Sequence, residues 1–330
     1  MKIKAYAALQ SGLAVEPYEL EIADPKSHEV LIEITHCSVG RGDVSFLRND
    51  YEIPDLKYPL VAGHELVGII EAIGNSVDSL IVGDRVGVGY QVSCCGVCEY
   101  CTSGREELCQ QQECLVMNRP GGLASHIVVN ERFACKIPDS LQSAETAPLS
   151  CSGLTTYSAI KKAQVKKNMR VGVIGIGGLG HFAIQLLEAL GAEVVAFSGK
   201  KNQEAIKELG ASRVVPYESR EEPLQTYDRL FVTTYAHIDY DYYLKLLKPD
   251  GELWVIGVDT QRTTFSSWLL NDFACRSIRG SYIGSQAEMH ELLELAANGA
   301  LQARSRQYPS GSLMKQYKWW RTVTQNFVSS

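Results

Sequence analysis

The sequence lacks any apolar run long enough to cross a bilayer, and its first residues lack the apolar core of a signal peptide. It also lacks a basic stripe or polybasic cluster, and its formal net charge is −6. Nucleic acid and anionic lipid both attract clustered lysine and arginine, so these absences argue against both as partners. We therefore expect a cytoplasmic protein that binds neither nucleic acid nor membrane.

No internal repeat and no low-complexity linker is present. Hydrophobic residues make up 45% of the 330 residues and charged residues 21%, as is typical of a soluble globular protein. A chain of this length is expected to form two domains. Ten cysteines without a signal peptide indicate a reducing compartment, where metal sites are commoner than disulfides.

The first part of the chain is rich in predicted β-strands. Short β-branched runs, separated by Gly, Pro and Asp, are typical of strands in a small barrel with loops. The predicted strands lie at 30–35, 66–74, 83–89 and 124–129.

Beyond residue 151, predicted strands alternate with predicted helices. The strands lie at 171–175, 193–197, 213–215, 229–233 and 251–257, and the helices at 152–163, 181–190, 203–209 and 240–247. Because such alternation favours parallel pairing, this part predicts an α/β fold with a doubly wound parallel sheet.

Four cysteines stand at Cys95, Cys98, Cys101 and Cys109, with the spacing C-x2-C-x2-C-x7-C. Four thiolates match the tetrahedral shell of Zn²⁺ and leave no open position, so the pattern predicts a structural zinc lobe at 93–110. The alternative is two disulfides or scattered free thiols. The tight spacing and the absence of a secretion signal disfavour that alternative.

A glycine-rich segment leaves a predicted buried strand and opens a predicted helix. Gly175 permits a tight turn, Gly177 lets the backbone approach a pyrophosphate, and Gly180 lets the helix pack on the strand. The predicted dinucleotide site comprises Gly175, Gly177, Gly178, Leu179 and Gly180, at a helix N-terminus that favours phosphate charge. The alternative is a glycine turn without a ligand, which this context disfavours.

The end of the second strand of this part distinguishes NAD from NADP, because an acidic residue there would hold the ribose 2′-hydroxyl. Here the strand is followed by Ser198, Lys200 and Lys201, without a carboxylate. A serine and two lysines suit a 2′-phosphate, so we predict NADP(H) as cofactor. The alternative is that the two lysines form an ordinary solvated turn.

Together these features resemble the zinc-type medium-chain dehydrogenase/reductase family, in particular its NADP-preferring cinnamyl alcohol dehydrogenase-like aldehyde reductases. The resemblance extends from the N-terminus to about Pro309. Besides the cysteines and the glycine loop, it rests on three segments: Gly63-His64-Glu65, the stretch from Pro148 to Tyr157, and the stretch from Leu247 to Gly251.

The resemblance implies two domains. A GroES-like β-barrel catalytic domain would span 1–150, a Rossmann NADP-binding domain 151–277, and 278–330 would return to the catalytic domain with an atypical C-terminal tail. The substrate would lie in the cleft between the domains, and homo-oligomers would be expected.

In the family, a catalytic zinc takes a cysteine from an early strand-loop, a histidine from Gly-His-Glu and a cysteine just before the cofactor domain. His64 and Cys151 match the last two ligands. Glu65 matches a glutamate that exchanges onto the metal or orients its shell, and Asp43 matches a retained aspartate. The resemblance therefore implies His64, Glu65 and Asp43 as catalytic residues, with His64, Glu65 and Cys151 as the remaining zinc site.

The first ligand position departs from the family. Gly40 stands where the cysteine ligand is expected, and Gly42 stands where the proton-relay hydroxyl is expected. Cys37 lies three residues before Gly40, and an odd offset along a strand tends to turn its side chain to the opposite face. With this ligand absent, His64 has the alternative role of a buried, hydrogen-bonded imidazole.

The residues after Pro309 also depart from the family's usual ending. Suitable codons from Met314 onward, read one nucleotide earlier, spell Asn-Glu-Ala-Ile-Gln-Val-Val-Glu-Asp-Gly-Asn-Ala-Lys-Phe-Arg, which resembles that ending. We state this as a frame-shift hypothesis that the nucleotide sequence decides, since incompatible codons would end it.

The predicted function is zinc-type, NADP(H)-dependent oxidoreduction of a small-molecule alcohol or aldehyde, impaired by the loss at Gly40. Two alternatives remain. One is a reductase of activated C=C or C=N bonds without catalytic zinc, and the other is an inactive or regulatory NADP-binding homologue.

Overall fold

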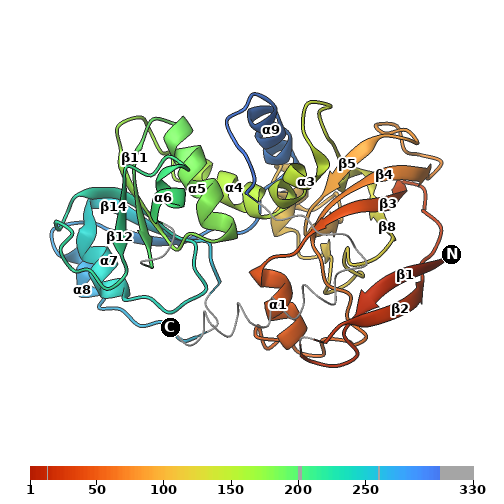
Figure 1. Cartoon of the computed structure of the whole chain (residues 1–330), viewed down its shortest axis with the longest axis horizontal. Coiled ribbons are helices and arrows are strands. Elements are labelled where there is room, and N and C mark those ends of the chain that lie inside the picture. The colour runs from red at the N-terminus through yellow and green to blue at the C-terminus, as the bar shows by residue number, and fades with distance from the viewer. Residues whose placement is uncertain (13, 200–202, 259–260, 305–330) are drawn as a thin grey trace. The chain divides into compact units, whose positions relative to one another are not determined.

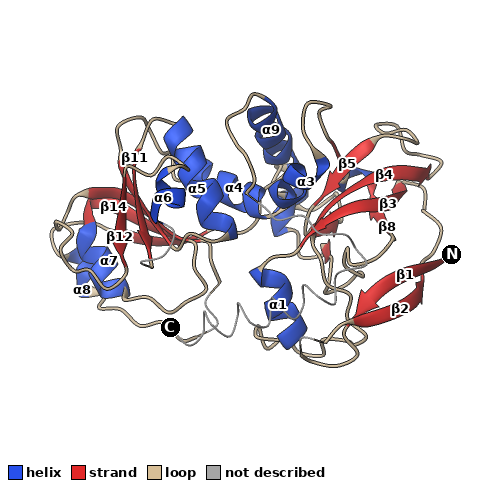
Figure 2. Cartoon of the chain, viewed as in Figure 1, coloured by secondary structure: helices blue, strands red, loops and turns tan. Residues whose placement is uncertain are grey.

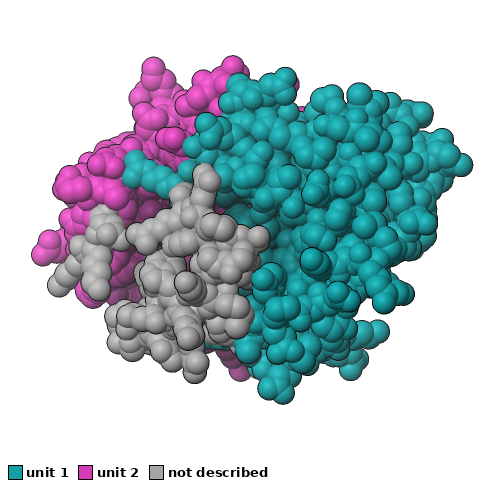
Figure 3. Space-filling view, turned by 45° about the vertical axis from the view of Figure 1, so that its right-hand side comes forward, with its two compact units in different colours: residues 1–151, 303–330 teal, residues 152–302 magenta. Residues whose placement is uncertain are grey.

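The computed structural model describes residues 1–12, 14–199, 203–258 and 261–304. The described residues form two compact units, Met1–Cys151 with Ala303 and Arg304 (unit 1) and Ser152–Gln302 (unit 2) (Figure 3). The sequence prediction placed the return to the first domain at 278, whereas contacts keep the chain in unit 2 up to Gln302.

Unit 1 is built on antiparallel strands, as Figure 1 shows. A five-stranded sheet has the order β8-β3-β4-β5-β9, and two smaller sheets pair β1 with β2 and β6 with β7. The strands are β1 (Lys2–Ala7), β2 (Glu16–Glu21), β3 (Glu29–Ser38), β4 (Glu65–Ile73), β5 (Arg85–Val88), β6 (Gln91–Ser93), β7 (Glu113–Cys114), β8 (His126–Asn130) and β9 (Cys135–Lys136). The four predicted strands are therefore found, as β3, β4, β5 and β8.

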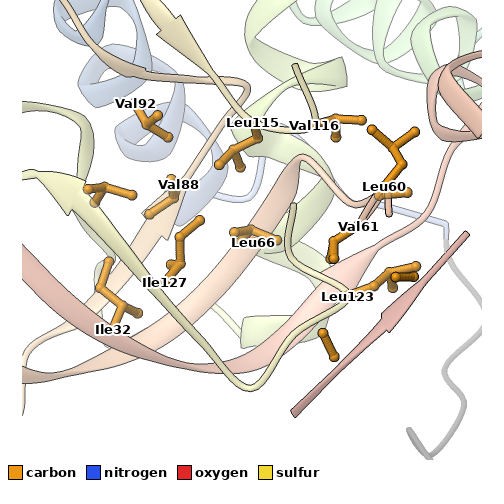
Figure 4. Close-up of a cluster of buried hydrophobic side chains, with 14 of the residues drawn as sticks. Ile32, Leu60, Val61, Leu66, Val88, Val92, Leu115, Val116, Leu123 and Ile127 are labelled. Carbon is orange, nitrogen blue, oxygen red and sulfur yellow. The ribbon is translucent and has the colours of Figure 1, made fainter. Parts of the chain in front are cut away.

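The core of unit 1 lies against this sheet. Ile32, Leu66, Val88 and Ile127 come from four different strands and lie close together, each almost fully buried (Figure 4). Burial of one such side chain stabilises the fold by about 1.5–3 kcal/mol. The packed sheet gives a rigid support for the loops at the ends of β3 and β4.

The helices of unit 1 are short. They are α1 (Arg41–Arg48), α2 (Glu99–Thr102) and α3 (Ser143–Thr146), with 3-10 turns at Glu106–Leu108, Glu131–Phe133 and Ala147–Ser150. Helix α1, which was not predicted, begins after Gly40, whose N–H donates to the Asp43 carboxylate at 2.8 Å. It ends at Asn49, which adopts a left-handed conformation with φ of 54°.

Unit 2 contains a six-stranded parallel sheet with the order β12-β11-β10-β13-β14-β15. In order along the chain this is 3-2-1-4-5-6, the order of a Rossmann sheet. The strands are β10 (Arg170–Ile174), β11 (Glu193–Ser198), β12 (Arg213–Pro216), β13 (Tyr227–Val232), β14 (Leu247–Val255) and β15 (Ser277–Gly280). The predicted α/β class and doubly wound parallel sheet are confirmed.

Helices cover both faces of this sheet (Figure 2). The helices of unit 2 are α4 (Ser152–Lys162), α5 (Gly178–Ala189), α6 (Gln203–Lys207), α7 (Tyr240–Leu246), α8 (Trp268–Asn271) and α9 (Gln286–Ala297). Of these, α5, α6 and α7 contact strands of the sheet, whereas α4 packs on α5 and α9 packs on α4. Helix α5 begins three residues before its predicted start, inside the glycine-rich segment. Helix α9 was not predicted, although Ser285 and Glu288 form a capping box at its start.

Candidate functional site

The four cysteines of the predicted zinc lobe converge in unit 1. The sulfur atoms of Cys95, Cys98, Cys101 and Cys109 all lie within 4.8 Å of one another. The Cys98 and Cys101 sulfurs are 3.5 Å apart and those of Cys95 and Cys101 are 3.9 Å apart, well beyond the disulfide bond length of about 2.05 Å. The lobe thus presents four free thiols, not two disulfides.

Backbone N–H groups surround these sulfurs. The N–H of Cys98 donates to the Cys95 sulfur at 3.3 Å, and the N–H of Gln111 donates to the Cys109 sulfur at 3.4 Å. Hydrogen bonds from the N–H groups of Val97 and Cys98 lower the pKa of Cys95 to about 6. This set of four donors in a small space fits a tetrahedral Zn²⁺ with Zn–S bonds of about 2.3 Å.

A second group of donors, which we call the His64 cluster, comprises His64, Glu65 and Cys151. Their ligand atoms lie within 4.8 Å of one another. His64 ends the loop before β4, Glu65 opens that strand, and Cys151 follows the 3-10 turn at Ala147–Ser150. One nitrogen, one sulfur and one carboxylate oxygen fit three positions of a zinc shell that keeps a further position open.

Asp43 orients this cluster from the first turn of α1. Its fully buried carboxylate accepts from the N–H groups of Gly40 and Gly63 at 2.8 Å each, and from the His64 Nδ1 at 2.9 Å. Because Nδ1 is engaged, Nε2 is the imidazole nitrogen left to face the other donors. Asp43 therefore joins the start of α1 to the loop that carries His64.

Electrostatics couple the same residues. Burial alone would lower the pKa of His64, but the nearby Asp43 carboxylate and Cys151 thiol outweigh it and hold the pKa well above its usual range. Burial alone would raise the pKa of Asp43, but His64 and the backbone N–H groups of Gly40 and Gly63 outweigh it and keep that pKa low. The pair is thus built to hold a negative carboxylate beside a polarised imidazole.

Gly63 is required by the geometry of this loop. Its φ is 100°, and an added Cβ would lie 2.7 Å from the Cys37 sulfur and 2.9 Å from the Leu123 nitrogen. Cys37 itself is not among the donors that come together with His64 among the described residues. Its thiol instead donates to the Ser38 carbonyl at 3.5 Å.

Gly40 and Gly42 leave different kinds of space. No atom lies within 4 Å of a Cβ built on Gly40. A Cβ built on Gly42 would lie 3.3 Å from Cε1 and 3.6 Å from Nε2 of His64. Position 42 therefore points at the imidazole, whereas a Cβ at position 40 has no such neighbour.

Three aromatic residues that no sequence motif indicates lie near His64. Phe46 and Tyr90 lie edge-on to the imidazole, with ring centroids 6.3 and 6.0 Å away, and Phe46 contacts Tyr51 edge-on at 5.1 Å. Aromatic side chains beside a polar cluster form the apolar wall that a small organic substrate requires. No local motif marks the three together, because Phe46 and Tyr51 belong to α1 and the turn after it whereas Tyr90 lies between β5 and β6.

The glycine loop of unit 2 has the geometry predicted for it. Gly175 has φ of 95°, and an added Cβ would lie 2.6 Å from the Thr234 Cβ. A Cβ on Gly180 would lie 2.1 Å from the Gly175 carbonyl oxygen. Both glycines are thus required by close contacts within the protein.

Gly177 differs, because no atom lies within 4 Å of its Cβ position although it caps the N-terminus of α5. The space before the helix is therefore open to a phosphate group. Gly178 and Leu179 form the first turn of α5, where a Cβ on Gly178 would lie 3.6 Å from the Ser152 hydroxyl. Ser198 ends β11, and Lys200 and Lys201 lie outside the described residues.

None of the described helices is both long and apolar enough to cross a membrane. Comparisons with known families match residues 26–139 to "Alcohol dehydrogenase GroES-like domain" and residues 178–298 to "Zinc-binding dehydrogenase". Aldehyde reductase YahK of Escherichia coli is 36% identical over 318 residues, covering 92% of this chain and 90% of the relative. Aldehyde reductase AdhA of Synechocystis is 34% identical over 298 residues, covering 89% and 88%.

Solved structures agree. A cinnamyl alcohol dehydrogenase from Sorghum bicolor superposes with a TM-score of 0.92 at 26% identity, covering 98% of this chain and 95% of the other. A CAD from Helicobacter pylori in complex with NADP(H) has a TM-score of 0.89 at 27% identity, covering 96% and 94%. The GroES-like and Rossmann folds predicted from sequence are both confirmed.

Proposed function

Because the chain belongs to the zinc-type medium-chain dehydrogenase/reductase family, we propose that it transfers hydride between NADP(H) and a small alcohol or aldehyde. Relatives named aldehyde reductases and cinnamyl alcohol dehydrogenases support this activity. A neighbour of the same fold in complex with NADP(H) supports the cofactor. Cytoplasmic location and homo-oligomer formation stay predictions.

We assign a structural zinc to Cys95, Cys98, Cys101 and Cys109, because the four sulfurs converge and leave no position for a substrate. We assign a second zinc to the His64 cluster. When bound, this zinc supplies Lewis-acid polarisation of the substrate oxygen, and NADPH supplies the hydride.

The chain's own residues prepare this site. Asp43 fixes the His64 ring through Nδ1 and so aims Nε2 at the other donors. The rings of Phe46, Tyr51 and Tyr90 lie together beside the donors and favour apolar carbonyl compounds. The cofactor would place its pyrophosphate at Gly177, with Ser198, Lys200 and Lys201 assigned to the 2′-phosphate.

The observation that carries the proposal is the convergence of His64, Glu65 and Cys151, with Asp43 bonded behind the histidine. The test is NADPH oxidation with a panel of aliphatic and aromatic aldehydes, alongside zinc analysis of the purified protein. We expect reduction of aldehydes, preference for NADPH over NADH, and loss of activity after treatment with a chelator. Absence of NADPH oxidation across the panel, in protein that binds NADPH, would favour the inactive homologue.

One observation favours a second candidate. Gly40 and Gly42 provide neither a thiolate nor a hydroxyl, and reduction of an activated C=C bond needs no metal-bound alcohol. Oxidation of NADPH by enals with saturated aldehydes as products, insensitive to chelators, would support this candidate over the first.

A further inference from the structure

Reduction of a carbonyl requires a proton as well as a hydride. The hydride adds to carbon, the C=O π bond breaks, and the oxygen takes up a proton. A donor must therefore lie beside the His64 cluster, where the substrate oxygen binds in the proposed function. Gly42, which faces the imidazole, has no group to donate.

A hydroxyl from another residue lies beside this space. The Cβ position of Gly42 is 3.6 Å from His64 Nε2 and 4.0 Å from the Tyr51 hydroxyl oxygen. Tyr51 lies after α1, nine residues beyond Gly42, and its hydroxyl and the imidazole both lie within 4.0 Å of this one position. A small side chain at position 42 would fill the region between the two rings, whereas glycine leaves the phenol next to the open side of His64.

Two contacts hold this phenol in place. The ring packs edge-on against Phe46 at 5.1 Å, and the hydroxyl shares a side-chain hydrogen bond with Ser45, which is buried within α1. The other tyrosine near His64 is committed elsewhere, because the Tyr90 hydroxyl donates to the Met117 sulfur at 2.7 Å. Of these two phenols, Tyr51 is the one aimed at the space beside position 42.

We propose that Tyr51 is the proton donor to the substrate oxygen, in place of the side chain that position 42 lacks. As hydride reaches the carbonyl carbon, the Tyr51 O–H bond breaks and its proton passes to the carbonyl oxygen, which yields the alcohol and NADP⁺. Ser45 holds the phenolic oxygen while it recovers a proton from water, to which the half-buried ring has access. This proposal rests on the proposed function and adds a catalytic residue, Tyr51, and a positioning residue, Ser45.

The first test is Tyr51→Phe, which removes the hydroxyl and keeps the ring. We expect aldehyde reduction to slow by on the order of 100-fold, while the affinity for NADPH stays unchanged. Tyr18→Phe is the matched control, since Tyr18 packs against the core of unit 1 on β2. Equal rates for Tyr51→Phe and wild type would overturn the proposal.

A binding measurement gives a readout that is independent of turnover. A primary amide has a carbonyl oxygen but is not reduced by NADPH, so its affinity for the enzyme–NADPH complex reports the hydrogen bond alone. Calorimetry should show about 5- to 10-fold weaker amide binding to Tyr51→Phe, as expected for one lost hydrogen bond. Unchanged amide affinity would overturn the contact between Tyr51 and the carbonyl.

Rescue provides the third test. Gly42→Ser in the Tyr51→Phe background places a hydroxyl near His64 Nε2 and should restore at least a tenth of wild-type activity. It should also restore the solvent isotope effect that the wild-type enzyme shows on this rate. If this double variant folds and binds NADPH normally but stays inactive, the result would contradict the claim that Tyr51 replaces a hydroxyl at position 42. Should Tyr51→Phe fold poorly, Ser45→Ala tests the same hydrogen bond and should also slow the reaction. A wild-type enzyme inactive with every carbonyl would instead overturn the proposed function itself.

Discussion

Gly40 stands where the family's cysteine ligand is expected, so a thiol at this position should add a ligand to the His64 cluster. A Cβ built there has no atom within 4 Å apart from those of Gly40 and its chain neighbours, and its φ of −114° suits any residue. We expect Gly40→Cys to fold normally and to raise the zinc content to a stable two per chain, with at least a tenfold gain in aldehyde reduction. Gly40→Ala, which adds the Cβ without the thiol, is the control. If Gly40→Cys holds no more zinc than Gly40→Ala, the assignment of a second zinc to the His64 cluster would be refuted.

Asp43 is the residue whose loss should cost the most stability near the site. Replacement by asparagine leaves a buried partner of His64 without its charge, and such a change destabilises by about 3–5 kcal/mol. Denaturant unfolding of metal-free Asp43→Asn and wild type measures this difference.

The pH dependence of that difference has a definite sign. The pKa of Asp43 is lower in the folded protein than in the unfolded chain, so its contribution is present above the unfolded value of about 3.9 and is lost as pH falls through the folded value. The gap between wild type and Asp43→Asn should therefore be full at pH 6 and shrink below about pH 4. A gap that widens in acid would contradict this account.

At the scale of elements, the glycine loop and α5 separate two roles of glycine. A Cβ on Gly180 would collide with the Gly175 carbonyl at 2.1 Å, whereas a Cβ on Gly177 would meet no protein atom. We expect Gly180→Ala to lower the melting temperature by several degrees and to weaken NADPH binding. Gly177→Ala should melt like wild type and still bind NADPH at least tenfold more weakly, as measured by fluorescence titration. Equal NADPH affinity for Gly177→Ala and wild type would place the pyrophosphate elsewhere.

The elements differ in how well the sequence predicts them. The parallel strands and the glycine loop are local signals, because β-branched runs and glycine spacing are each contained within a few residues. Helix α1 was missed because it starts at a glycine and is stabilised by Asp43, whose other partners, Gly63 and His64, lie some twenty residues away. The aromatic residues around His64 were missed for the same reason, since only tertiary packing brings them together.

At the scale of the whole molecule, the boundary predicted at 278 differs from the observed division because the sequence does not reveal which partner β15 takes. That strand pairs with β14 as the last strand of the parallel sheet, and α9 packs with α4 in the same unit. Pairing of β15 and packing of α9 thus keep the chain in unit 2 up to Gln302. The neighbours of Gly175, Gly178 and Gly180 in the cofactor loop also belong to unit 2.

Because the cysteine ligands lie in unit 1 and the cofactor loop lies in unit 2, loss of the structural zinc should destabilise unit 1 alone. Cys109→Ser removes a fully buried ligand, so zinc should fall by one per chain and proteolysis should begin within unit 1. Cys94→Ser is the matched control, because Cys94 is adjacent to the ladder but outside the four-sulfur group. NADPH binding should persist in Cys109→Ser, since Gly175, Gly177 and Gly180 keep their neighbours. Loss of NADPH binding together with the zinc, measured by titration and elemental analysis on the same sample, would mean that unit 2 depends on the lobe for its fold.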